Sequence, residues 1–198
     1  MAYLFYTIAV VSVFYPLSVW FNSSLLKFGQ FNLFDLFPAF GLLAFSVMWL
    51  HVVGGAFRVY LEKYINFERF VYWSSIVVLI SLILHPGLLF LALYMSGGGS
   101  PYDFVPDGKE YLITIAIVAW VIFIGYDILK FFRKRGVLIK HWEVIKLIST
   151  LALFLGFFHS IGIGRDLQTN PLRSVWIFYG ITATIATVYT YFIKPFRK

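Results

Sequence analysis

Four histidines are the side chains of this sequence best suited to metal chemistry. His85 and His159 each lie inside a long apolar stretch, where an imidazole without a partner is energetically costly. Because histidine is the commonest metal ligand, a metal centre held by these two residues is the most economical interpretation. The alternative is that each histidine is a structural hydrogen-bonding residue packed between helices.

A haem iron would accept both imidazoles as axial ligands. Pro86 follows His85 and cannot donate to the carbonyl group of Leu82, so a kink there would open space beside the ligand. Gly156 lies one turn before His159 and leaves room for a porphyrin face. We expect each imidazole to donate its other ring N–H to a backbone carbonyl one turn earlier in the chain.

Four further residues are candidates for roles at such a centre or beside it, and the fourth histidine is not. His51 is a third ligand, a quinone contact or a structural hydrogen-bonding residue. Lys146 either ligates a second iron or extends its ammonium group to the membrane interface, and the second interpretation is favoured. Arg165 and Arg173 are candidates to pair with haem propionates. His141 lies in a basic connection and is expected to be an interfacial residue.

The composition indicates a membrane protein. The chain is 61% hydrophobic and only 13% charged, which is more apolar surface than a soluble domain of 198 residues can bury. It has no cysteine, which excludes iron–sulfur clusters and thiolate haem ligation. The net charge of +7 comes from basic residues at the ends of apolar stretches, so we expect a lipid bilayer and not a nucleic acid as the partner.

Six stretches are apolar over about 18 residues or more, the length that crosses a bilayer. They predict an all-α, polytopic membrane protein in which residues 1–198 form a single six-helix transmembrane domain. The predicted helices are Ala2–Phe21, Leu36–Leu61, Phe70–Met95, Tyr111–Phe132, Trp142–Gly162 and Ser174–Ile193.

The basic residues predict how the helices are oriented. Most lysines and arginines lie on the side shared by both termini, so the positive-inside rule places both termini in the cytoplasm. The Gly-rich connection Ser96–Glu110 is then expected outside, in a bacterial-type inner membrane or a plasma membrane. On this topology His85 and His159 both fall in the outer half of the bilayer.

The order of helices and histidines resembles the ferric reductase-like transmembrane domain superfamily. It is most similar to the small bacterial members that serve as the haem subunit of periplasmic methionine sulfoxide reductase. The fifth helix begins Trp142-Glu-Val-Ile-Lys146 and reaches His159, where the family pattern has a tryptophan followed by two histidines. Tyr72 stands where two-haem members have a further histidine. The resemblance implies haem b on His85 and His159, with one haem expected and a second disfavoured.

The resemblance also implies a function, which is that of a membrane cytochrome b relaying electrons across the bilayer to an acceptor on the outer side. The chain has no Gly-x-Gly-x-x-Gly motif after a strand, so it has no flavin or NAD site of its own. Electrons would come from a separate reductase or from a quinol, which makes quinone a further candidate cofactor. The alternative is a haem-free membrane transporter or scaffold whose histidines are structural or handle protons.

Overall fold

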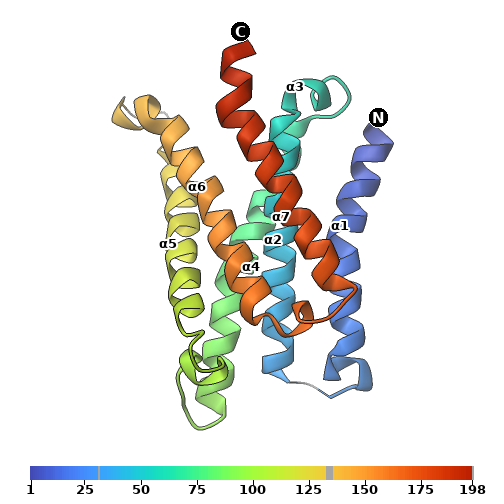
Figure 1. Ribbon diagram of the computed structural model, residues 1–198, viewed down its shortest axis with the longest axis vertical. Helices are drawn as coiled ribbons and strands as arrows, with labels where there is room; N and C mark the ends of the chain where they lie inside the picture. The colour runs from blue at the N-terminus through green and yellow to red at the C-terminus, as the bar shows by residue number, and fades with distance from the viewer. Residues whose placement is uncertain (31, 133–135, 198) are drawn as a thin grey trace.

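The computed structural model describes residues 1–30, 32–132 and 136–197, and every regular element within them is helical. Six helices are long and apolar enough to cross a membrane (Figure 1). They are α1 (Ala2–Ser23), α2 (Leu33–Ala56), α4 (Phe67–Met95), α5 (Tyr111–Phe131), α6 (Gly136–Ile163) and α7 (Leu172–Val188), which continues through a π-helix (Tyr189–Ile193). The predicted all-α six-helix bundle is therefore confirmed, and the chain is an integral membrane protein.

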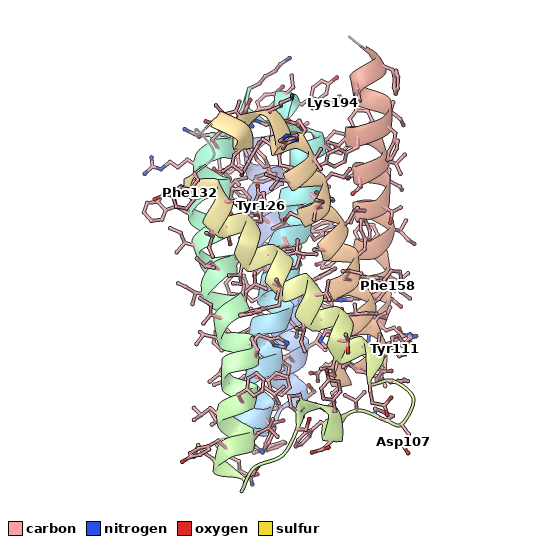
Figure 2. The ribbon with its side chains drawn as sticks, turned by 90° about the vertical axis from the view of Figure 1, so that its left-hand side faces the viewer. Asp107, Tyr111, Tyr126, Phe132, Phe158 and Lys194 are labelled. Carbon is pink, nitrogen blue, oxygen red and sulfur yellow. The ribbon has the colours of Figure 1, made fainter. Side chains whose placement is uncertain are left out.

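Both termini lie at one end of the bundle, together with the short helix α3 (Arg58–Leu61), the last residues of α5 and the first residues of α6 (Figure 1). We call this the terminus end. The Gly-rich connection lies at the opposite end, which we call the loop end. Figure 2 shows Phe132 and Lys194 at the terminus end and Asp107 and Tyr111 at the loop end.

Two helix boundaries differ from the expectation. The predicted helix Leu36–Leu61 is broken, because α2 ends at Ala56 and α3 follows as a separate turn. The fifth span begins at Gly136, so His141 is an exposed residue inside α6 and not part of a connection. Basic residues flank this first turn in the sequence, with Arg135 before it and Lys140 after it, so the stretch resembles a connection although it is helical. The basic residues Arg133, Lys134, Arg135 and Lys198 lie outside the described residues.

Asparagine side chains cap the N-terminal ends of two helices. The Asn32 side chain accepts a hydrogen bond from the backbone N–H of Phe34 at the start of α2, at 2.9 Å. The Asn66 side chain accepts one from Arg69 at the start of α4, also at 2.9 Å. Each satisfies one of the N–H groups that a helix start leaves without a partner.

Pro86 affects how α4 packs against α5. Because proline has no N–H, the carbonyl oxygen of Leu82 has no partner within α4. The indole Nε1–H of Trp120, on α5, donates to that oxygen at 2.8 Å. Pro86 therefore removes one hydrogen bond from α4, and the carbonyl group that it frees accepts a hydrogen bond that joins α4 to α5.

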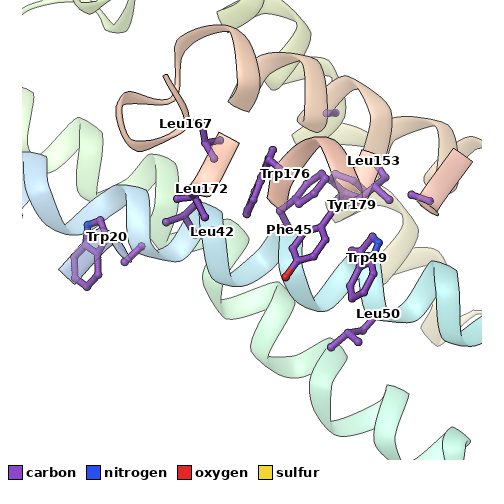
Figure 3. Close-up of a cluster of buried hydrophobic side chains, with 14 of the residues drawn as sticks. Trp20, Leu42, Phe45, Trp49, Leu50, Leu153, Leu167, Leu172, Trp176 and Tyr179 are labelled. Atoms are coloured by element: carbon purple, nitrogen blue, oxygen red, sulfur yellow. The ribbon is translucent and has the colours of Figure 1, made fainter. Parts of the chain in front are cut away.

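Pro16 in α1 also frees a carbonyl oxygen of its own helix, and the residue that donates to this oxygen belongs to the main hydrophobic core. It frees the carbonyl oxygen of Ser12, which accepts a hydrogen bond from the Tyr179 hydroxyl at 2.8 Å. The Tyr179 ring also stacks on Trp49, with centroids 4.3 Å apart. Figure 3 shows this cluster, in which aromatic rings of α2 and α7 form the contact surface.

Candidate functional site

A hydrogen bond to the backbone of α2 holds the His85 ring in place. Its Nδ1 lies 2.9 Å from the carbonyl oxygen of Phe37. A carbonyl oxygen only accepts, so Nδ1 carries the proton and Nε2 keeps its lone pair. A Cβ atom at Gly41 would lie 2.9 Å from Cε1 of the ring, so the imidazole occupies the space that this glycine leaves.

His159 is held in the same way by another helix. Its Nδ1 lies 3.1 Å from the carbonyl oxygen of Leu112, at the start of α5, so its Nε2 also keeps the lone pair. A Cβ atom at Gly162 would lie 2.5 Å from Leu112, which shows how closely α5 and α6 approach here. A Cβ atom at Gly156 would contact nothing within 4 Å, so open space lies one turn before His159.

The structure brings His85 and His159 to the same end of the bundle. Phe37 and Leu112 lie in the first turns of helices that begin at the loop end, and the two imidazoles are close enough to interact electrostatically. The expectation that each carbonyl partner lies one turn earlier is wrong, because both partners lie on neighbouring helices. A backbone carbonyl oxygen has two lone pairs, so the oxygens of Phe37 and Leu112 can each accept an imidazole N–H from a neighbouring helix in addition to a helical N–H.

The two arginines expected near propionates have partners of their own. Arg165 Nη1 lies 2.6 Å from Oδ1 of Asp35, whose side chain is only 4% exposed. Arg173 Nη1 donates to the carbonyl oxygen of Leu167 at 3.3 Å. The Asp35 ion pair joins α2 to the α6–α7 connection, and the propionate role stays a prediction.

His51 makes a structural hydrogen bond. Its Nε2 lies 2.7 Å from Oγ of Ser74 on α4. The Ser74 hydroxyl directs its only hydrogen to the carbonyl oxygen of Phe70, at 2.6 Å, so His51 must be the donor. The nitrogen that most often binds a metal is therefore engaged, as the structural alternative for this residue predicts.

A cavity of about 530 Å³ lies in the terminus-end half, between α2, α4, α5, α6 and α7. We call it the inner chamber. Its lining includes Met48, His51, Arg58, Glu68, Tyr72, Ser75, Leu82, Phe123, Asp127, Lys130, Trp142, Lys146, Thr150, Leu153, Thr190 and Tyr191. Its lining includes neither His85 nor His159, but Leu82 lies one turn from His85 along α4.

Two residues that the expected resemblance singled out, Tyr72 and Lys146, both line the inner chamber. Lys146 does not offer a free amine, because its Nζ lies 2.7 Å from Oε1 of Glu143. This contact agrees with a lysine that extends to the interface and not with one that ligates iron.

Two lining residues of the inner chamber, Arg58 and Glu68, belong to an ion-pair cluster. Arg58 Nε lies 2.6 Å from Glu62, and the same guanidinium also pairs with Glu68. The hydrogen bond to Glu62, reinforced by Glu68, raises the pKa of Arg58, so this arginine stays charged. The cluster ties α3 to the start of α4 at the edge of the membrane span.

Sequence reasoning did not find the inner chamber or the seat of His85 at Gly41. The chamber had a partial signal, because Tyr72 and Ser75 are polar residues one turn apart inside an apolar stretch. Gly41 had none, since a glycine in an apolar helix is common. Comparison of the chain with protein-family models, with curated proteins and with solved structures finds no match.

Proposed function

We propose that this protein is a membrane cytochrome b in which His85 and His159 are the two axial ligands of one haem b. The observation that carries the proposal is the tautomer of the pair. Both imidazoles donate Nδ1–H to a backbone carbonyl and have no partner for Nε2 among the described residues. A backbone carbonyl that accepts from Nδ1–H, with Nε2 left free, is the arrangement that orients a histidine toward a metal.

The residues present fit such a group. Two neutral imidazoles are the donor set of a six-coordinate haem, and the open space at Gly156 lies beside one of them. With both axial positions filled, a bound haem would supply one-electron transfer and no substrate site. The contribution of the chain is to fix both rings: Phe37 and Leu112 hold the tautomers, and Gly41 admits the His85 ring.

We further propose that the terminus end faces the cytoplasm and the loop end faces outward. The excess of lysine and arginine near the termini supports this orientation. Electrons would enter from a separate reductase or a quinol on the cytoplasmic side and leave to an acceptor beside the loop end. The chain would then act as the electron-transfer subunit of an oxidoreductase.

The visible spectrum of the purified full-length protein tests the proposal. We expect a Soret band and an α-band that appears on reduction, as for a six-coordinate haem b. Colourless protein from haem-supplied cells would exclude the cytochrome and favour the second candidate function.

That second candidate is a haem-free transporter, and the inner chamber is the observation in its favour. Ionisable residues inside membrane spans commonly mark ion or substrate pathways, and Asp127, Lys130 and Lys146 all line this cavity. A transporter would use the chamber, whereas the cytochrome needs the histidine pair. The spectrum therefore separates the two without further assumptions.

A further inference from the structure

The lining of the inner chamber changes character along the bundle axis. Charged residues such as Arg58 and Lys130 line it at the terminus end, where the spans reach the level of lipid headgroups. Toward the membrane centre, the deepest lining residue on each of four helices is apolar. These residues are Met48 on α2, Leu82 on α4, Phe123 on α5 and Leu153 on α6. A cavity with one polar end and one apolar end matches an amphipathic ligand.

The charged residues inside the chamber indicate which charges the polar end of the ligand carries. Arg58 and Lys146 already have carboxylate partners. Asp127 makes no ion pair or hydrogen bond in the described part of the chain, although it is close enough to Lys130 to interact electrostatically. Among the residues that the structure describes, Lys130 donates only to the Ser75 hydroxyl, at 3.3 Å. One anion and one cation, a single turn apart on α5, are therefore available to a ligand.

We propose that the inner chamber is a binding site for a membrane phospholipid with a zwitterionic phosphoethanolamine headgroup. The ammonium group pairs with Asp127, the phosphate pairs with Lys130, and an acyl chain lies against the apolar deep end. An anionic headgroup would leave Asp127 without a counter-charge inside the span, where an unpaired charge is expensive. The assignment uses neither His85 nor His159, so it holds with or without haem.

Native mass spectrometry of the full-length protein from nanodiscs tests the lipid class. The nanodiscs contain equal amounts of phosphatidylethanolamine and phosphatidylglycerol. We expect one phosphatidylethanolamine retained per chain, with a preference of about tenfold or more, the size that one charge-assisted contact supplies. Equal retention of both lipids, or no retained lipid, would overturn the proposal.

Two variants locate the site. Asp127→Asn should abolish the preference for phosphatidylethanolamine, and Lys130→Gln should weaken retention of both lipids. The matched controls are Asp107→Asn and Lys109→Gln, which change the same residue types in the loop-end connection and should retain lipid as the unmodified protein does. Chamber variants that behave like these controls would contradict the assignment.

Two further measurements test whether the retained molecule is a lipid and whether its loss is independent of haem. Soluble phosphoethanolamine at millimolar concentration should not displace the lipid from the unmodified protein, because it lacks the acyl chain; complete displacement would overturn a lipid as the ligand. If a chamber variant fails to fold, the lipid preference of the unmodified protein decides alone. The visible spectrum is recorded on every sample, and lost lipid with retained haem leaves the proposed cytochrome function intact.

Discussion

In the loop-end half of the bundle, His85 and His159 each donate Nδ1–H to a backbone carbonyl, and Nε2 has no partner among the described residues. In the terminus-end half, His51 lines the inner chamber and donates Nε2–H to a serine hydroxyl. A carbonyl accepts only, so it fixes both the tautomer and the direction of the ring. The Ser74 hydroxyl directs its hydrogen to Phe70 and accepts from His51 Nε2, so the nitrogen that is free in the other two histidines is occupied here.

The glycines show the same contrast. Gly41 lets the His85 ring lie directly against the α2 backbone, and Gly162 lets the side chain of Leu112 approach α6. Contacts of this kind bring neighbouring helices close together at Gly41 and Gly162, whereas hydroxyl, amine and carboxylate groups line a cavity in the other half. The two proposals made above use this difference, with a haem held by a histidine pair in one half and an amphipathic molecule in the other.

The largest effect is expected when an imidazole of the rigid pair is removed. His85→Ala and His159→Ala should each lose the haem or convert it to a five-coordinate form, because one axial ligand disappears. Reduced-minus-oxidised spectra and pyridine haemochrome content measure this. His141→Ala is the control and should change neither, since His141 is exposed on α6. Unaltered spectra and full haem content in both single variants would show that His85 and His159 are not the axial ligands.

A smaller effect is expected from filling the seat of His85. A methyl group in Gly41→Ala would lie 2.9 Å from the imidazole and turn the ring away from its position. We expect about tenfold weaker haem retention, the size of a lost orienting contact. Gly125→Ala places the same methyl group in open space and should retain haem normally. Equal retention by both variants would mean that the position of the ring is unimportant.

The hydrogen bonds to proline-freed carbonyls should contribute to stability without affecting the haem. Tyr179→Phe and Trp120→Phe each leave a carbonyl oxygen without its donor, at an expected cost of about 1 kcal/mol. Thermal unfolding in one detergent measures the cost. Tyr94→Phe is the control for Tyr179, because Tyr94 is 82% exposed. Variants as stable as this control would show that the carbonyls find other partners.

The smallest effect is expected at the residues that would have to ligate a second haem. His51→Ala and Lys146→Ala should retain the full haem content, with one haem per chain by pyridine haemochrome assay against protein mass. His51 is engaged with Ser74 and Lys146 with Glu143, so neither is free for iron. A ratio near two, halved by either variant, would place a haem in the inner chamber and displace the lipid proposed there.

The sequence by itself determined the six spans, the two ends of the bundle and the presence of His85 and His159 in the same half. These follow from local quantities, namely runs of apolar residues, the positions of charges and chain direction. It also identified the Leu82 carbonyl as freed by Pro86, because proline chemistry is local. Helix ends were less accurate, since the first turn of α6 is helical although basic residues flank it in the sequence.

Only the tertiary structure decided which atoms meet. The carbonyl partners of the two histidines, the Asp35–Arg165 ion pair and the inner chamber all join residues far apart in the chain. Every helix here is apolar on most of its circumference, so hydropathy does not distinguish a face that meets lipid from one that meets protein. The rotation and register of neighbouring helices decide that, and they are set by contacts such as Gly41 with His85 that no single segment encodes.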